Sequence, residues 1–436
     1  MNNITVPFRG QVLSVKLPES WRILDELRPH SMPSLDDLPS ALHHALQKPT
    51  GCAPLSSSDL FQKKIVIAVD DISRPTPLYR YFDVIIKFLV DHGASRENML
   101  IVTALGIHRP MTAQEVEAKI GAGNLRGLAW TNHNCRDMEH LVGVGITTRG
   151  TDVILNKHLV EADLIVCVGA IEPHTLLGFG GGLKMILPGL AHERTIAQNH
   201  MQGVSPDAFN FIGRHESAMR LDLEEGAQML GKRIFIINAL MNENLDICRF
   251  VAGDPILAHR EGVRMAESLF GCRINEKADV AIVVSNPMNA DLRQGFKCMA
   301  NAEPCLKEDG LILGLLECKH GIGDVAIPPK TLPHGVLRRM MKLLGKNRVL
   351  WFVDNLKKGA GVEERFLAHF SLQALRKNEI FVYSPNLPSD TGRRLGIIRQ
   401  FPDVAGMLDA ARKYAPTRAR VYVCPHGGVT YPILSG

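Results

Sequence analysis

The chain has 436 residues, of which 45% are hydrophobic and 22% are charged, and its formal net charge is +5. This length predicts about two to three domains, and the composition is that of an ordinary globular protein. A net charge this small argues against a nucleic-acid-binding protein, whose basic residues would be in large excess or in runs, but it is compatible with anionic small-molecule ligands.

Nine cysteines are scattered along the chain, and none forms a C-x-x-C pair. The odd number and wide spacing favour thiols in a reducing cytosol over a disulfide framework. The first residues lack the basic and apolar segments of a signal peptide, and no apolar run reaches the roughly 18 residues that a membrane span requires. We therefore expect a soluble cytoplasmic protein without a membrane partner.

Short apolar runs rich in β-branched residues recur along the chain and predict its strands. In chain order they are Lys64–Asp70, Met99–Gly106, Asp163–Gly169, Arg233–Leu240, Asp279–Pro287, Gly310–Glu317, Arg348–Asp354, Glu379–Pro385 and Ala419–Pro425. Their hydrophobicity is continuous rather than alternating, which is typical of strands buried on both faces of a parallel sheet.

Helical stretches separate these runs. Thr76–Gly93 has an amphipathic pattern that ends at a glycine, and Thr112–Glu115 reads TAQE, a capping-box signature that opens the next helix. Residues 1–60 give no clear element. The alternation predicts an α/β protein with two domains, mainly parallel sheets and an active site in the cleft between the domains.

A polar stretch near Gly271–Asp279 suggests the boundary between the two domains. We expect an N-terminal cofactor-binding and catalytic domain over residues 1–273. The C-terminal domain, residues 274–436, would contribute substrate-binding residues, and the last residues of the chain would pack back on the first domain.

The stretch Gly178–Leu190, GFGGGLKMILPGL, contains five glycines around Lys184. It is not a Walker A loop, because Leu183 precedes the lysine and Met185 stands where Mg²⁺ needs a hydroxyl. It is not a dinucleotide fingerprint either, because Leu183 occupies the third glycine position. Glycine runs also serve turns and close packing, and that interpretation stays open.

Polar side chains follow several predicted strands at their carboxyl ends, where open α/β sheets bind ligands. They are Asp70, Asp71, Ser73 and Arg74 after the first run, His108 and Arg109 after the second, Glu172, His174 and Lys184 after the third, and Arg293, Gln294 and Lys297 after Asp279–Pro287. Each alone has an ordinary role as a capping, paired or solvated residue. The two histidines, the Asp/Arg pair and Lys184 all fall at predicted strand ends in one half of the chain, and this grouping predicts a catalytic cleft.

The residue types indicate acid–base chemistry on an anionic substrate. His108 and His174 can flank one carbon as an acid–base pair because imidazole titrates near neutral pH, and Arg and Lys suit a carboxylate. His200 lies in a predicted helix, but the sequence HERTI at His192 lacks the second histidine of H-E-x-x-H. A metal held by His200 would take most of its ligands from a cofactor.

The chain resembles the lactate racemases that depend on a nickel-pincer nucleotide, and their 2-hydroxyacid racemase and epimerase relatives. The resemblance rests on DDISRPTP, GIHRPMTAQE, EPHTLLGFGGGLKMILPGLAHERTIAQNH and RQGFK, in this order between residues 60 and 300, and CPHGGVTYPIL near the C-terminus also fits. Together these motifs are highly specific, whereas each alone is weak.

The resemblance implies an isomerase that inverts C2 of a 2-hydroxy acid with a cofactor made of nickel and pyridinium-3,5-bisthiocarboxylic acid mononucleotide. Lys184 would carry this group through a thioamide, and His200 would ligate nickel in a planar geometry, which suits Ni(II). Cofactor-biosynthesis and nickel-insertion proteins would be its partners. The other implied roles are acid–base catalysis by His108 and His174, cofactor binding by Asp71, Ile72, Ser73 and Arg74, and substrate binding by Arg74, Arg293, Gln294 and Lys297.

In the implied reaction, one histidine takes the proton of the 2-hydroxyl while hydride leaves Cα for the cofactor. Hydride then returns to the opposite face of the planar 2-keto acid, and the other histidine gives the proton. Because the Cα–H is far too weakly acidic for a histidine base, the cofactor carries the hard step. The glycines near Lys184 would let the backbone pack beside the planar ring.

Two positions depart from the family pattern. Ser73 stands where a threonine is expected and keeps the hydroxyl, and Arg293 stands where lactate-specific members carry an aromatic residue. The substrate therefore stays open between lactate and a larger, dicarboxylic or sugar-derived hydroxy acid. The interpretation of Arg293 as an ordinary solvated helix residue stays open as well. The main alternative is a metal-dependent hydrolase or phosphotransferase that uses the glycine-rich stretch for phosphate; a non-catalytic cofactor carrier ranks after it. The sequence does not fix the oligomeric state.

Overall fold

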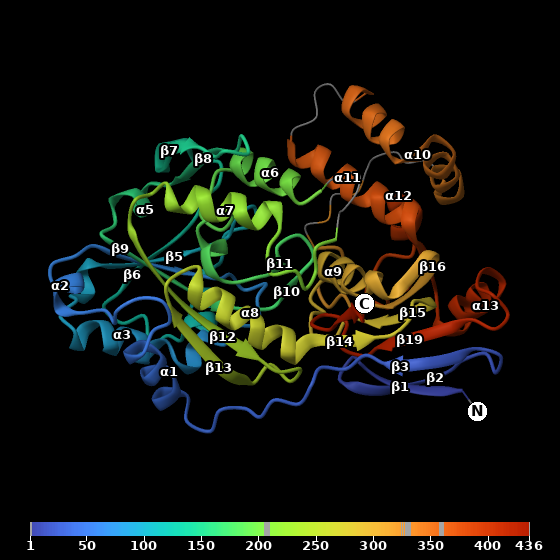
Figure 1. Cartoon of the computed structure of the whole chain (residues 1–436), viewed down its shortest axis with the longest axis horizontal. Coiled ribbons are helices and arrows are strands. Elements are labelled where there is room, and N and C mark those ends of the chain that lie inside the picture. The colour runs from blue at the N-terminus through green and yellow to red at the C-terminus, as the bar shows by residue number, and fades with distance from the viewer. Residues whose placement is uncertain are drawn as a thin grey trace.

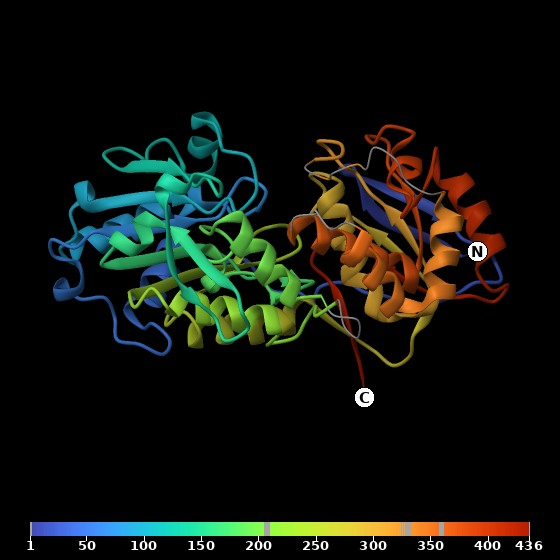
Figure 2. The same cartoon turned by 90° about the horizontal axis from the view of Figure 1, so that it is seen from above.

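The computed structural model describes residues 2–435 except 205–209, 324, 326, 328–332 and 357–361. Its chain forms two lobes, each built around a six-stranded sheet with helices on its faces (Figures 1 and 2). The predicted α/β fold with mainly parallel sheets is confirmed. No helix among the described residues is both long enough and apolar enough to cross a bilayer, and none of the nine cysteines, all of them described, forms a disulfide.

The first lobe holds a sheet in the order β13-β12-β9-β4-β5-β6. Its strands are β4 (Ile65–Val69), β5 (Met99–Thr103), β6 (Ala129–Asn132), β9 (Leu164–Ala170), β12 (Arg233–Met241) and β13 (Ile247–Gly253). All pairs are parallel except β12 with β13. The chain adds β5 and β6 on one side of β4 and then β9 and β12 on the other. The topological switch point, where such sheets bind ligands, therefore lies between β4 and β9.

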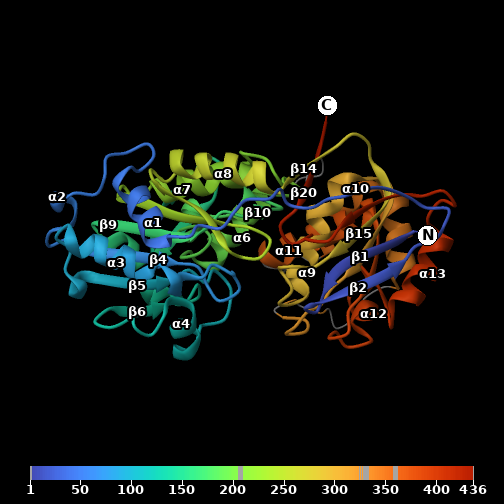
Figure 3. The same cartoon turned by 90° about the horizontal axis from the view of Figure 1, so that it is seen from below.

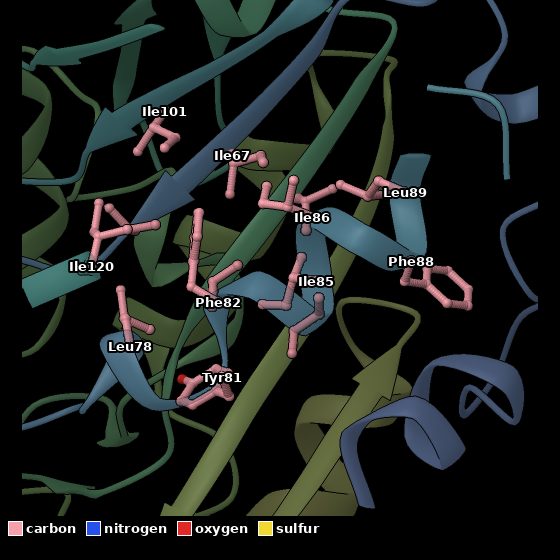
Figure 4. Packing of buried hydrophobic residues seen from close by; sticks show 14 of the residues in the cluster. Ile67, Leu78, Tyr81, Phe82, Ile85, Ile86, Phe88, Leu89, Ile101 and Ile120 are labelled. Atoms are coloured by element: carbon pink, nitrogen blue, oxygen red, sulfur yellow. The ribbon is translucent and has the colours of Figure 1, made fainter. Parts of the chain in front are cut away.

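Helices cover both faces of this sheet, which is why β4 is buried at every position. One face carries α1 (Leu38–Gln47), α3 (Phe82–Asp91) and α4 (Ala113–Ile120), and the other carries α5 (Lys157–Glu161), α6 (Glu193–Gln202) and α7 (Ala218–Gln228). Helix α3 places Phe82, Ile85, Ile86 and Leu89 at helical spacing against Ile67 of β4 (Figure 4). The predicted capping box is confirmed, since the side chain of Thr112 accepts from Glu115 N and that of Glu115 accepts from Thr112 N.

The second lobe holds an all-parallel sheet in the order β18-β17-β16-β15-β19-β3. Its strands are β3 (Arg22–Glu26), β15 (Ala278–Val284), β16 (Leu306–Leu315), β17 (Glu379–Tyr383), β18 (Arg399–Phe401) and β19 (Arg420–Cys424). Its helices are α9 (Leu292–Ala302), α10 (His334–Leu356), α11 (Val362–Lys377), α12 (Thr391–Leu395) and α13 (Val404–Tyr414). Helix α9 follows the carboxyl end of β15 and faces the first lobe.

The N-terminal residues do not belong to the first lobe, although the sequence analysis assigns residues 1–273 to one domain. Strands β1 (Asn3–Phe8) and β2 (Gln11–Lys16) form a hairpin that lies on the second lobe (Figure 3). Its Ile4 and Val6 pack in the core of the second sheet, and β3 pairs with β19. A first domain beginning at residue 1 is therefore wrong for this segment, because the hairpin buries its apolar face in the other core. The boundary near residue 273 stays a prediction.

The end of the chain runs back toward the first lobe. Strand β20 (Tyr431–Leu434) pairs in parallel with β14 (Gly271–Ile274), and the ring of Tyr431 lies 5.9 Å from that of Phe179. Tyr431 thus joins an apolar cluster with residues of the first lobe. This is the packing that the sequence analysis expects for the tail.

One predicted strand is a helix. Arg348–Asp354 lies in α10, which has a non-helical kink at Gly345 (φ 72°). The run RVLWFVD is short, and its five central residues are all apolar; such a run fits a strand or a buried helix equally well. The other eight predicted strands are present, and so is the helix predicted around His200.

Candidate active site

The predicted polar residues converge at the switch point of the first sheet. Asp71 and Arg74 follow β4, and Glu172 and His174 follow the neighbouring β9. The second lobe closes this edge with α9, which packs against the short strand β10 (Pro173–His174). Residues far apart in the sequence and on two lobes therefore share one cleft.

His108 is held by a carboxylate on one side and reaches α9 on the other. Its Nδ1 lies 2.7 Å from Oδ2 of Asp71, and Arg293 Nη1 lies 3.3 Å from its Nε2. Burial alone would raise the pKa of Asp71, but the hydrogen bond and charge of His108 and the charge of Arg74 hold that pKa well below its usual value. Because the ionised carboxylate accepts from Nδ1–H, Nε2 is the basic nitrogen and faces the cleft.

His174 has the opposite arrangement. Its Nδ1 accepts hydrogen bonds from Leu176 N at 3.3 Å and Leu177 N at 3.2 Å, so the proton of the neutral ring sits on Nε2. Burial lowers the pKa of His174 well below its usual value, and the charges of Lys184 and Lys297 lower it further. The cleft therefore holds one histidine with a basic Nε2 and one with an Nε2–H.

Glu172 links the two lobes at the centre of the cleft. Its Oε1 lies 2.8 Å from Arg74 Nη1 and 2.9 Å from Lys297 Nζ, so one carboxylate pairs with a cation from each lobe. The sequence analysis gives Glu172 a place at a strand end but no role. Its position two residues before His174 was the available signal, and only the structure shows that it bridges the lobes.

Replacing Glu172 by glutamine should lower the free energy of unfolding by about 3 kcal/mol, because two largely buried cations lose their shared carboxylate. Burial would raise the pKa of Glu172, but the charges of Lys297, Arg74 and Lys184 lower it from 4.5 to about 2. The stabilisation of the folded protein by ionised Glu172 is therefore fully present above about pH 4.5 and is lost as the pH falls toward 2.

Urea denaturation at several pH values measures this effect. The difference in free energy of unfolding between the wild type and Glu172→Gln should become smaller as the pH falls below 4.5. The exposed control Glu161→Gln should have the free energy of unfolding of the wild type at every pH. A gap of constant size across this range would contradict the assignment.

Lys184 lies in the short 3-10 helix η4 (Gly182–Met185) and lines a small pocket with Arg74 and Glu172. Burial lowers the pKa of its amine well below the usual value, and the charges of Arg74, Lys297 and Arg220 lower it further against the opposing charge of Glu172. No ion pair of this amine occurs among the described residues. An unprotonated lysine amine is a nucleophile that can be acylated.

The glycines before Lys184 allow the loop to pack closely against neighbouring segments of the same chain. A Cβ at Gly178 would lie 1.8 Å from Arg214 O, and one at Gly181 would lie 2.8 Å from Ile171 Cγ1; both glycines have positive φ. At Gly182 a Cβ would lie 2.8 Å from the ring of His259. Close packing of the loop therefore explains these three glycines. That the glycine backbone also lies beside a planar ring stays a prediction.

Buried polar side chains hold the loop from behind and so fix the position of Lys184. The contacts are Arg220 Nη2 donating to Phe179 O, His259 Nε2 at 2.8 Å from Gly180 O, and Gly182 N donating to Asn238 Oδ1 at 2.9 Å. The sequence analysis misses these three residues because they lie 41, 56 and 79 positions from the residues that they contact, with no motif around them.

His200 on α6 has the geometry of a metal ligand. Its Nδ1 lies 2.7 Å from Ile196 O and donates to it, so Nε2 is the unprotonated nitrogen. Burial lowers the pKa of His200 to about 4, and the charges of Lys184 and Arg293 act in the same direction. Among the described residues no three His, Cys, Asp or Glu side chains gather into a metal site.

The remaining predicted residues are less tightly joined to this cluster. Ser73 donates its backbone N–H to Asp71, while its hydroxyl oxygen and Oε1 of Gln294 are buried without a hydrogen-bond partner in the described part of the chain. Ile72 is 45% exposed, and Arg109 pairs with Glu115 on α4 rather than with the cluster. Buried polar atoms without partners are rare and fit a site that receives a polar ligand.

Comparison with known proteins agrees with this geometry. Residues 9–210 match the family described as the lactate racemase N-terminal domain. Lactate racemase from Thermoanaerobacterium thermosaccharolyticum is 30% identical over 332 residues, 74% of this chain and 76% of that protein. Lactate racemase from Lactiplantibacillus plantarum is 31% identical over 283 residues, 64% of this chain and 66% of that protein.

Two solved structures share the fold. The lactate racemase apoprotein from Thermoanaerobacterium thermosaccharolyticum matches with a TM-score of 0.80 and 25% identity over 100% of both chains. A crystal structure of a Thermotoga maritima protein matches with a TM-score of 0.67 and 18% identity over 93% of this chain and 100% of that chain, a likeness of fold alone. By sequence similarity over 74% of its length, the chain belongs to the lactate racemase family and is an isomerase, a racemase of that family.

Proposed function

We propose that this racemase inverts C2 of a 2-hydroxy acid by hydride transfer, using a nickel-pincer nucleotide attached to Lys184. The observation that carries the proposal is the pair of histidines with opposite proton positions, in a cleft that also holds a buried lysine whose pKa is lowered well below its usual value. A racemase needs an acid and a base that exchange roles between the two enantiomers, and this pair provides them.

The residues at the site fit this cofactor. Lys184 presents an amine ready for acylation, His200 presents Nε2 to a metal, and the unpartnered Ser73 hydroxyl and Gln294 amide oxygen can bind polar groups. Because the described residues hold no cluster of three metal ligands, most ligands of a nickel ion at His200 would come from the bound nucleotide. When bound, this group accepts a hydride from Cα and returns it.

The side chains of this chain then bind the acid and move its hydroxyl proton. Arg74 and Lys297 are placed to bind the carboxylate, with Glu172 fixing both cations. His108 Nε2 takes the proton of the 2-hydroxyl, and Asp71 stabilises the resulting imidazolium. His174, which must first be protonated to imidazolium, gives its Nε2 proton to the oxygen of the opposite enantiomer and is left as the neutral ring. The proton that His108 takes and the proton that His174 gives are exchanged with solvent between turnovers. In the reverse direction the two histidines exchange these roles.

A chiral-chromatography screen of D- and L-2-hydroxy acids, including aldonic acids, tests the proposed reaction. Enzyme produced together with the cofactor-making proteins should convert at least one acid into its C2 epimer. Absence of epimerisation across such a panel by enzyme that carries the cofactor would contradict the proposal.

The substrate is proposed to be a larger hydroxy acid with a second anionic group rather than lactate, the substrate in the names of the relatives. Arg293 supports this, because its guanidinium lies beside the proposed base His108. Replacing Arg293 by leucine should lower kcat/KM for a 2-hydroxy dicarboxylate about 10-fold to 100-fold, the effect of losing a hydrogen bond to a charged group.

The ratio of kcat/KM for malate to that for lactate measures this preference without depending on the total activity. The ratio should fall in Arg293→Leu and stay unchanged in Arg412→Leu, a surface control. An unchanged ratio in Arg293→Leu would exclude Arg293 as a specificity residue.

The other functional alternatives have less support. A hydrolase or phosphotransferase has less support because the family of the chain is one of racemases, and close packing already explains Gly178, Gly181 and Gly182. The cytoplasmic location and the partnership with cofactor-biosynthesis and nickel-insertion proteins stay predictions.

A further inference from the structure

A second cavity, of about 560 Å³, lies in the second lobe between α10, α13 and the sheet. It is lined by Glu379 and Arg399, the first residues of β17 and β18. The proposed active site uses α9, which follows the carboxyl end of β15. Since all strands of this sheet are parallel, the cavity lies at the opposite edge of the sheet from α9. Its volume is that of a small-molecule site.

The inner wall of the cavity is a fixed charged network. Arg338 is 8% exposed and donates to Tyr414 Oη at 2.9 Å, to Glu379 Oε2 at 3.0 Å and to Asp309 Oδ1 at 3.1 Å. His334 lies 2.8 Å from the other oxygen of Glu379. Groups held by several contacts on different elements form a preorganised wall.

The cations of this cavity outnumber its carboxylates. Arg338, Arg339, Lys342 and Arg399 line it, and the carboxylates that pair with them are Asp309 and Glu379. Among the described residues, four positive groups less two negative groups leave two positive charges. Neither Arg339 nor Arg399 forms an ion pair within the described part of the chain.

Arg399 is nevertheless held in place. Its guanidinium carbon lies 4.7 Å from the centre of the Phe381 ring and 5.8 Å from that of Phe401. Stacking on aromatic rings restrains the plane of a guanidinium group and leaves its N–H edge able to bind an anion.

We propose that this cavity binds a small molecule that carries a phosphate group. A phosphate dianion matches the two excess charges, and arginine forks match phosphate oxygens in geometry. The free phosphate ion and a nucleoside monophosphate offer the same chemistry, and the experiment separates them. The inference does not depend on the proposed racemase reaction.

Isothermal titration calorimetry of the full chain with inorganic phosphate and with AMP, at fixed ionic strength, tests the proposal. We expect one site per chain, and an Arg339→Gln/Arg399→Gln variant should bind at least about tenfold more weakly because two charged contacts are lost. The matched variant Arg393→Gln/Arg412→Gln, at exposed positions of the same lobe, should bind as the wild type does. Tighter binding of AMP than of phosphate would identify a nucleotide.

Three results would overturn the proposal. They are no binding of either probe, equal weakening in the two double variants, and loss of binding in Lys184→Ala, which would assign the phosphate to the candidate active site. Because all four substituted arginines are exposed, both variants should unfold at the temperature of the wild type, which a thermal melt checks.

Discussion

Replacing Lys184 by alanine should abolish racemisation, with kcat lowered on the order of 10⁴-fold or more, as when a covalent catalytic group is removed. The reason is that burial and neighbouring cations lower the pKa of the Lys184 amine well below its usual value, which favours the nucleophilic form that can be acylated. Lys184→Arg should be equally inactive, because a guanidinium stays protonated and cannot replace the amine.

Activity and mass are measured on the same preparations. The wild type, produced with the cofactor-making proteins, should show an added mass on the peptide that contains Lys184, and both variants should lack it. Lys87→Ala is the matched control, because Lys87 lies on the surface and pairs with Asp91. An active wild-type enzyme with an unmodified Lys184 would contradict the assignment.

Replacing either cleft histidine by glutamine should lower kcat about 10²-fold to 10⁴-fold, the usual contribution of a general acid or base. Both His108→Gln and His174→Gln should slow the reaction from either enantiomer, because each direction needs one histidine as acid and the other as base. Progress curves started from each pure enantiomer and followed by chiral chromatography measure both directions.

Asp71 should act only through His108. Asp71→Asn removes the negative charge that holds Nδ1–H, so its activity should fall, but the Asp71→Asn/His108→Gln double variant should be no slower than His108→Gln alone. Surface His140, whose Nδ1 also lies 2.7 Å from an aspartate, is the matched control, and His140→Gln should retain full activity. Additive losses in the double variant would show that Asp71 acts independently of His108.

Much of the fold follows from local sequence patterns. The buried strands of both sheets are continuous apolar runs, and the helix after β4 and the capping box at Thr112 were predictable from spacing alone. Two errors have physical causes. The run RVLWFVD has no periodicity that separates strand from helix, and β3 joins β19 across almost the whole chain, a pairing that no local pattern encodes.

The site was predictable in its members but not in its contacts. Strand ends and the family motifs place His108, His174, Lys184 and His200 near one another. The bridging role of Glu172 requires knowing how the lobes meet, because it pairs with Lys297, 125 positions away in the sequence. The glycine run shows the same limit, since its packing role appears only when the atoms behind each glycine are known.

Racemisation of a 2-hydroxy acid labelled with deuterium at Cα, in ordinary water, tests the proposed hydride transfer most directly. Enzyme carrying the cofactor should give product of inverted configuration that retains most of the deuterium at C2, because hydride leaves and returns without exchanging with solvent, while His108 and His174 handle only the hydroxyl proton. Complete replacement of that deuterium by solvent hydrogen would show that a base removes the Cα proton, and it would contradict hydride transfer.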